Sequence, residues 1–119
     1  GQEYHLRPSH EAIEAIEAAT GRSAYELAGA ARAMALPLRH CAIVAAEMMK
    51  AYARTHPDDP LHTDHAGANP RRVAEMIHEA GSMKIQPRLA VVLIAAVTGG
   101  VDAAGEMKPA TASPPPAAG

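Results

Sequence analysis

The sequence is poor in the large aromatic side chains that usually fill a protein core. It contains no Phe and no Trp, and only three of its 119 residues are Tyr, although 48% of its residues are hydrophobic. Alanine supplies much of that fraction, so each contact between two elements buries little area. We therefore expect a single small domain with a modest core, in which a protein partner or a second copy adds stability.

Cysteine pairs, a strong net charge and long apolar runs are missing too. The lone Cys41 excludes an internal disulfide and lies among apolar residues, which predicts a buried structural thiol. A net charge of −2 provides no basic field for nucleic acid. No signal peptide pattern is visible, and no apolar run reaches the roughly 18 residues that a membrane span needs. We expect neither a nucleic-acid nor a membrane partner. Because the chain starts with Gly1 rather than Met, the sequence leaves open whether Gly1 is an added residue or whether an N-terminal piece is missing.

Catalytic motifs are also missing from the sequence. No glycine-rich phosphate loop follows an expected strand, and no Ser/His/Asp arrangement has a supporting sheet. Glu14 and Glu17 lie on one expected helix, whereas a catalytic carboxylate pair usually faces a cleft between elements. We therefore expect a protein that is not an enzyme and that has no cofactor.

Residues 37–55, PLRHCAIVAAEMMKAYART, form the longest helical pattern in the chain. Pro37 suits a first helical turn, and His56-Pro57 ends the helix because a residue before proline is pushed out of the α region. The apolar residues leave only a narrow polar strip, which is typical of a helix packed on several sides. We predict that this is the central helix. Its apolar stripe comprises Leu38, Cys41, Ala42, Ala45, Met48, Met49 and Tyr52.

Four further helices are expected around the central one. The first two begin at Ser9, as an N-cap, and at the capping box of Ser23 and Glu26. A later helix runs from Asn69-Pro70 to Gly81, since both ends carry typical capping residues. Residues 89–97 are apolar without a break, which fits a buried strand or a buried helix. Pro87 at a first-turn position and the glycines at 99–100 favour the helix.

Both ends of the chain depart from this helical pattern. Residues 2–7, QEYHLR, alternate apolar and polar side chains, which predicts a short β-strand in need of a neighbour. Residues 101–119 end in ATASPPPAAG, whose small residues and prolines cannot build a core. We predict a helical domain over residues 1–100 and a disordered Pro/Ala-rich tail over residues 101–119. The expected fold class is mainly α, a small Ala-rich bundle of about five helices with a short N-terminal β-strand.

Two groups of polar residues are candidates for function. Glu11, Glu14 and Glu17 form a row on the first helix, which is either a solvated acidic face or a ridge that docks a basic partner. Residues 56–69, HPDDPLHTDHAGAN, are expected to be a long loop that is either solvated or metal-binding. Its spacing fits no helix-borne or zinc-finger template, so we assign no metal site. The candidate ligands are His56, Asp58, His62, Asp64 and His65, with Asp59 beside them.

The order of the expected elements resembles the small tail proteins of gene transfer agents and related long-tailed phages. A short strand ends at Leu6-Arg7, and a helix reading AIEAIEAATG follows over residues 12–21. A second short helix starts at Ser23, and the central helix follows Leu36-Pro37-Leu38. The resemblance covers roughly residues 3 to 100, and its most specific part is the turn Ile16-Glu17-x-x-Thr20-Gly21.

The resemblance implies a protein without catalytic residues that acts in tail assembly. The family carries both a tail tube and a tail assembly chaperone label. A chaperone would bind the long, helical tape measure protein in the cytoplasm of the bacterial host, on tail assembly intermediates. The alternatives are a structural tube component that stays in the particle, and a metal-binding module that uses the loop from His56 to His65. A tube subunit needs a substantial β-sheet to close a ring, which argues for the chaperone.

Overall fold

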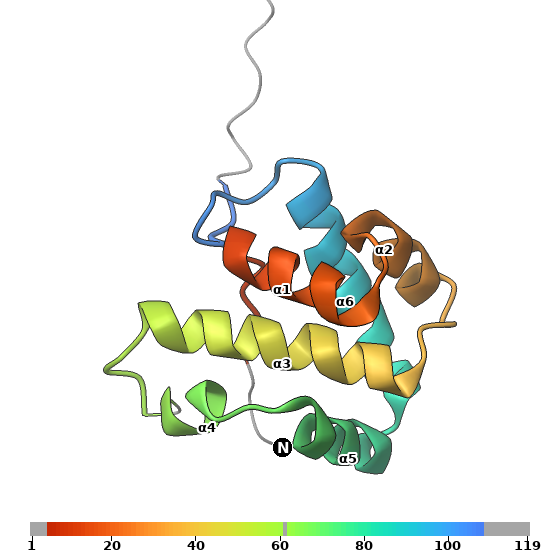
Figure 1. The fold of residues 1–119 in the computed structure, drawn as a ribbon, viewed down its shortest axis with the longest axis horizontal. Helices are drawn as coiled ribbons and strands as arrows, with labels where there is room; N and C mark the ends of the chain where they lie inside the picture. The colour runs from red at the N-terminus through yellow and green to blue at the C-terminus, as the bar shows by residue number, and fades with distance from the viewer. Residues whose placement is uncertain (1–4, 61, 109–119) are drawn as a thin grey trace, which may run out of the picture.

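The computed structural model describes residues 5–60 and 62–108, and this part of the chain is mainly α-helical (Figure 1). The predicted fold class is confirmed. Five helices lie close to where the sequence predicted them, and a single extra turn, α4, lies in the expected loop. The helices are α1 (His10–Thr20), α2 (Ala24–Arg32), α3 (Leu38–Thr55), α4 (His62–Ala66), α5 (Pro70–Ala80) and α6 (Ser82–Val97).

Helix α3 lies at the centre of the molecule, as predicted. α1, α4, α5 and α6 all contact it, and in Figure 1 it crosses the middle of the view between α1 and the pair α4 and α5. Ala45 and Met48, near its midpoint, are 1% and 0% exposed. Helix α2 packs mainly along α6 instead. The fold therefore has one buried central helix and a second helix pair, α2 and α6, at one side of it.

Alanine makes up nearly half of the buried hydrophobic residues among those described. Side chains this small let helix backbones approach closely, but each contact buries little area. The larger buried side chains, such as Ile16, Leu27 and Leu93, come from different helices and fill the spaces between them. The core is therefore continuous but thin, as the composition predicts.

The predicted helix caps are present. The Ser9 hydroxyl accepts the Ala12 N–H at the start of α1, and Ser23 and Glu26 form the reciprocal capping box of α2. The Asn69 side chain accepts the Arg72 N–H at the start of α5. These bonds satisfy N–H groups that have no partner inside a helix. Local sequence therefore sets where these three helices begin.

Helix α6 begins at Ser82, five residues before the predicted start at Pro87. The prediction used the preference of proline for a first helical turn, but the helix extends through Pro87. Pro87 is exposed, so the Met83 carbonyl that loses its usual N–H partner can face solvent. The buried side of the same turn carries Gln86, whose Oε1 accepts the Leu36 N–H at 3.0 Å. That bond joins α6 to the connection between α2 and α3.

The predicted N-terminal strand is not formed in the described residues. Residues 5–9 have no regular structure, and the rest of the predicted strand lies outside the description. The segment crosses α3, where the Arg7 N–H donates to the Met48 carbonyl at 3.1 Å. Leu6 packs against the core. In the described residues 5–7, the apolar Leu6 therefore packs on a helix and not in a strand pair.

Residues 101–108, which the sequence assigned to the Pro/Ala-rich tail, form specific hydrogen bonds in the structure. Asp102 Oδ1 accepts the N–H groups of Ala104 and Glu106 and closes a tight turn. The Ala103 carbonyl accepts the His10 N–H at the start of α1, where backbone donors lack helical partners. This segment is therefore held by backbone bonds that composition does not reveal. Residues 109–119 lie outside the described part of the chain.

The predicted long loop also contains structure, because residues 62–66 form the short helix α4. No single helix among the described residues is long and apolar enough to cross a membrane. α5 and α6 reach the length and apolar composition of a membrane span only when they are taken together, and the chain bends by 119° between them.

Candidate protein-binding surface

The three glutamates of the predicted acidic row are exposed on α1, but each has an intramolecular partner. Glu11 lies 3.6 Å from the Arg54 guanidinium, and Glu14 lies 3.8 Å from His10. Glu17 Oε2 accepts the Ala24 N–H at 2.8 Å, which places it over the first residue of α2. Glu17 therefore helps to cap α2, and Glu11 and Glu14 remain as the exposed acidic pair of the row.

Three of the six candidate metal ligands after α3, namely His56, Asp59 and His65, belong to an aromatic cluster around Tyr52. His65 is fully buried, and its Nε2 accepts the His5 N–H at 2.9 Å. His56 stacks on Tyr52, with 4.0 Å between ring centroids, and its Nδ1 lies 3.1 Å from the Tyr52 carbonyl oxygen. Asp59 accepts a 2.6 Å hydrogen bond from the Tyr52 hydroxyl. These side chains hold the segment after α3 against the end of that helix.

His5 completes this cluster from the other side of Tyr52, at 4.5 Å between ring centroids. Asp58 is exposed, and the side chains of His62 and Asp64 lie outside the description. Among the side chains that are described, no three His, Cys, Asp or Glu groups are arranged to hold a metal ion. The sequence analysis did not predict that His5 and Tyr52 belong to this cluster. The only signal was the i, i+4 spacing of Tyr52 and His56, which places their rings on the same side of a helix.

Cys41 is buried, as predicted, and its Sγ lies 3.6 Å from the Leu36 carbonyl. Burial raises the pKa of the thiol to about 11 because desolvation disfavours the thiolate. A thiol that stays protonated and enclosed is a poor nucleophile and a poor metal ligand. Cys41 therefore acts as a small core residue.

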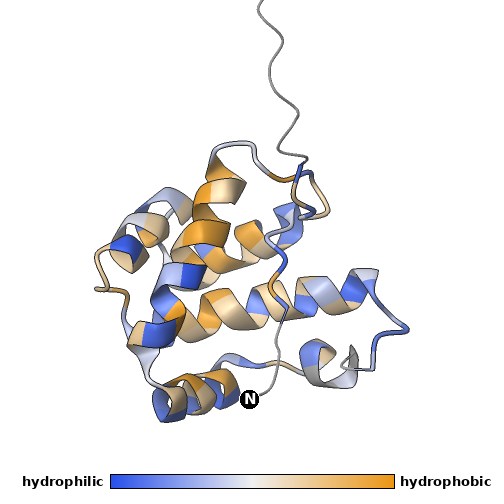
Figure 2. Ribbon diagram, turned by 180° about the vertical axis from the view of Figure 1, so that it is seen from behind, coloured by the Kyte–Doolittle hydropathy of each residue, from blue (hydrophilic) through white to orange (hydrophobic). Residues whose placement is uncertain are grey.

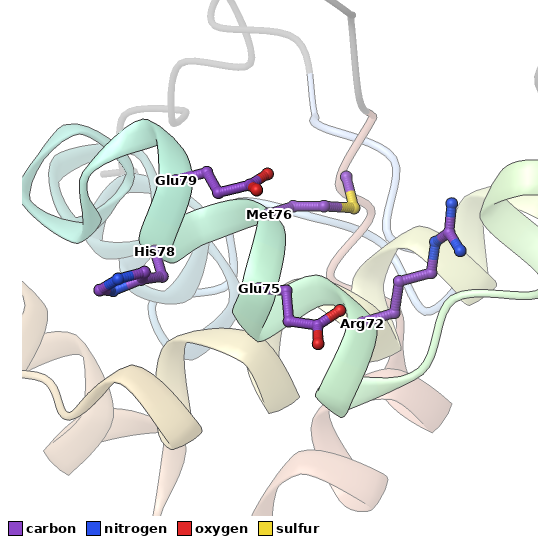
Figure 3. A pocket seen from close by; sticks show the side chains of 5 residues that line it. All are labelled: Arg72, Glu75, Met76, His78 and Glu79. Carbon is purple, nitrogen blue, oxygen red and sulfur yellow. The ribbon is translucent and has the colours of Figure 1, made fainter.

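A hollow of about 520 Å³ lies on the outer side of α5 (Figure 3). The lining residues that the structure describes all come from this one helix, and Figure 3 shows their side chains pointing in different directions. Within the described part of the chain, no second element encloses a ligand here or aligns two reacting groups. The lining residues are Arg72, Glu75, Met76, His78 and Glu79.

The best candidate for binding is a groove between α2 and the C-terminal half of α6, with a volume of about 280 Å³. Tyr25 on α2 is 76% exposed, and Val97 on α6 is 39% exposed. Gly29 lies between them, and a Cβ at this position would meet no atom within 4 Å. The groove is therefore apolar, open and bounded by two helices. Its lining residues are Tyr25, Ala28, Gly29, Arg32, Ile94, Val97 and Thr98.

The apolar surface continues from this groove along α6. Val91 is 60% exposed one turn before Ile94, and Arg88 lies exposed one turn before Val91. Figure 2, seen from behind, shows α6 as a strongly hydrophobic helix on the near side of the molecule. Together with Arg32, Arg88 places positive charge beside the apolar strip. Exposed apolar surface rimmed by charge is typical of a protein-binding site.

A second groove, with a volume of about 390 Å³, lies between the first turns of α3 and α5. Leu38 and Ala74 line it together with Arg39 and Arg71, but Leu38 is only 36% exposed. The α2–α6 groove is smaller in volume, but its large side chain Tyr25 is more exposed than Leu38 and so more accessible to a partner. Comparison of the chain with models of protein families, with curated proteins and with solved structures finds no match.

Proposed function

We propose that this protein is a non-catalytic tail assembly protein of a phage or gene transfer agent. In this proposal it works in the cytoplasm of the bacterial host as a chaperone of the tape measure protein. The order of helices and the turn from Ile16 to Gly21 support the family assignment. The single structural observation that carries a binding function is the open apolar groove between α2 and α6.

The groove suits a helical partner. An amphipathic helix binds by laying its apolar face into a hydrophobic groove, with anchors spaced by three or four residues. Tyr25, Val97 and Val91 offer such contacts over about two turns of α6. Arg32, which lines the groove, favours acidic residues on the partner beside its apolar face. Because the contact area is small, binding at one site is weak, and repeated sites along a long helix supply the avidity.

The tube alternative has less support in the described residues. A ring of tube subunits requires strands that pair between neighbours, whereas the described part of the chain has only one isolated bridge, between Val101 and Met107. This supports the chaperone over a tube component that stays in the particle. Detection of this protein as a stoichiometric part of purified particles would reverse that preference.

Co-expression with the long helical protein of the same operon, followed by co-purification, tests the proposal. We expect a complex with the wild-type chain and at least a tenfold weaker one with Tyr25→Asp. Position 25 is the second residue of α2, where an acidic side chain is favourable for the helix, so this variant should keep its fold. Circular dichroism checks that.

A matched variant on α1 separates the two candidate surfaces. Glu11→Gln combined with Glu14→Gln removes the acidic pair and leaves Glu17 in place to cap α2. We expect this double variant to bind as the wild type does. If this double variant loses binding while Tyr25→Asp still binds, the partner binds the acidic row. If neither the wild type nor any variant forms a complex, the chaperone proposal itself is contradicted.

A further inference from the structure

Helix α2 buries one side and exposes the other. It packs on α6 and α1 and lies at the outer edge of the molecule (Figure 1). Leu27 and Ala31 are buried on its inner side, whereas Tyr25, Gly29 and Arg32 are exposed. Because these three positions recur at intervals of three or four residues, they form one stripe along the outer side of the helix.

The two large side chains of this stripe have complementary chemistry. A guanidinium is attracted to the face of an aromatic ring, because that face carries partial negative charge. Within the described part of the chain, Arg32 forms no ion pair and no other ring stacks on Tyr25. The two residues are seven positions apart, which is about 10 Å along a helix, so they are too far apart to contact each other in one chain.

A second copy of the same helix provides the missing partner for both. Tyr25 precedes Ala28 by three residues, and Arg32 follows Gly29 by three residues. When two antiparallel α2 helices cross between Ala28 and Gly29, Tyr25 of each copy therefore comes level with Arg32 of the other. The two-fold symmetry of such a pair forms this contact twice. These four residues are the α2 residues that line the α2–α6 groove.

The crossing point is suited to close approach of two helices. A Cβ at Gly29 would meet no atom within 4 Å, and the residue that comes level with it, Ala28, is small. Small side chains at a crossing let the two helix axes lie close together. The apolar side chains of Ile94 and Val97 line the same groove from α6, and Val97 is 39% exposed. They can therefore pack against the second copy.

We propose that a second copy of this chain occupies the α2–α6 groove, with the α2 helices antiparallel and Tyr25 of each copy on Arg32 of the other. Because both copies use the same surface, the assembly closes as a dimer and does not extend into a filament. The groove has a volume of only about 280 Å³, so the dimer is weak and exchanges readily. Only one consequence rests on the proposed function, namely that the second copy and a partner helix compete for this groove.

Sedimentation equilibrium of the full chain tests the dimer without any partner protein. We expect a monomer–dimer equilibrium at chain concentrations up to about 1 mM, which populates even a dimer with a millimolar Kd. Tyr25→Arg places two cations together at both ends of the crossing, so we expect at least tenfold weaker association. Arg32→Glu removes the cation from each ring and should weaken association about threefold.

An equimolar mixture of these two variants tests the antiparallel arrangement. In a mixed dimer the introduced arginine faces the introduced glutamate at one end, and the native Tyr25 and Arg32 remain paired at the other. We expect the mixed dimer to be at least threefold tighter than the dimer that either variant forms with itself. Arg72→Glu makes the same charge change at an exposed position of α5. It should dimerise as the wild type does and should not rescue Tyr25→Arg.

Gly29→Gln keeps the proposal testable if a charge at position 25 disturbs the fold. This variant replaces a helix-interior glycine by a better helix former, and its side chain enters open space in the monomer. At the crossing the same side chain holds the two helices apart, so we expect at least fivefold weaker association. Circular dichroism checks that each variant is folded.

Three results would overturn the proposal. A chain that stays monomeric at all concentrations would mean that the second copy does not bind. A dimer unaffected by Tyr25→Arg and by Gly29→Gln would place the contact on another surface. A mixture without tighter association than its components would rule out the antiparallel pairing. None of these results involves a tape measure protein, so failure here is separate from failure of the proposed function.

Discussion

Helices α3 and α6 are both rich in apolar residues, but the structure uses them differently. α3 is enclosed by α1, α4, α5 and α6, and ten of its residues are buried. α6 is covered by α2 on one side and leaves Val91 and Val97 exposed on another. The comparison shows that an apolar run alone does not determine burial. The placement of the neighbouring helices decides it: α2, α3 and α5 all pack on α6, yet the side of α6 with Val91 and Val97 stays exposed.

The largest expected effect comes from placing the same charge in each helix. Ala45→Asp buries a carboxylate in the centre of α3, at a site that is 1% exposed. This costs several kcal/mol, comparable with the whole stability of about 5–10 kcal/mol, so we expect loss of folding. Val91→Asp, at a 60% exposed site of α6, should cost less than about 1 kcal/mol.

Circular dichroism melts of both variants measure this difference. A cooperative, near-wild-type melt of Ala45→Asp would contradict the central position of α3. Loss of the folded state in Val91→Asp would mean that its side of α6 is covered in the intact protein.

The next largest effect is expected at Gly105, in the segment after α6 that turns back to the start of α1. Gly105 has φ +88, and an added Cβ would lie 2.5 Å from Arg7 Cγ and 2.7 Å from Ser9 N. We expect Gly105→Ala to destabilise the protein by about 2–3 kcal/mol and to release residues 101–108. Urea unfolding measures the loss in stability, and hydrogen exchange of the His10 amide reports the release.

Gly99→Ala is the control for this substitution. Gly99 also has a positive φ, +79, but a Cβ there would meet nothing within 4 Å. Its expected cost is only the backbone strain of roughly 1–2 kcal/mol, without faster exchange at His10. Equal effects of the two variants would show that residues 101–108 do not pack closely on residues 7–9.

A smaller effect tests how the buried face of α6 is held. Gln86→Met keeps the apolar stem but removes the acceptor of the Leu36 N–H. Leaving that buried donor without a partner should cost about 1–3 kcal/mol. Lys84→Met, at an exposed position of the same helix, should change the urea midpoint by little. A neutral Gln86→Met would indicate that water or a shift of the backbone replaces the bond.

The smallest expected effect is a pH dependence at the start of α3. Burial, and next the charges of Arg22 and Arg39, lower the pKa of His40 below its usual 6.5. The unfolded chain then binds more protons than the folded one, so His40 should reduce stability as the pH falls below about 6.5. Arg22 lies 3.3 Å from His40 Nδ1, a contact that requires this nitrogen to be unprotonated.

Melting temperatures of the wild type and His40→Gln between pH 7 and pH 5 measure this contribution. All other residues are the same in both proteins, so the difference between the two curves isolates His40. We expect the wild type to lose more stability than the variant over this interval. The opposite sign would mean that protonated His40 gains a partner in the folded state.

Local sequence predicted the helices best where a side chain bonds to a backbone group nearby. Ser9, Ser23 and Asn69 cap helices at the expected positions, since each bond spans only three residues. The start of α6 was missed because Pro87 is tolerated on the exposed side of a helix whose other side is fixed by Gln86. That bond joins residues fifty positions apart, so no local pattern reveals it.

The candidate site was not predictable in the same way. The sequence pointed to Glu11, Glu14 and Glu17 and to the residues from His56 to His65, because these residue types are common in binding sites. The structure assigns Glu17 to a cap and His65 to a buried contact with His5. The described lining of the α2–α6 groove is Tyr25, Ala28, Gly29, Arg32, Ile94, Val97 and Thr98, a set of residue types that is not distinctive in a sequence.

The sequence by itself determined that this protein is mainly helical, that α3 is its central helix and that its core is thin. Helical period, caps and residue size act within a few residues of one another, so they can be read in order along the chain. Only the tertiary structure decided which apolar face stays open and that residues 101–108 pack against the start of α1. Those outcomes depend on contacts between distant segments, where one backbone bond or one missing neighbour decides whether a residue is covered.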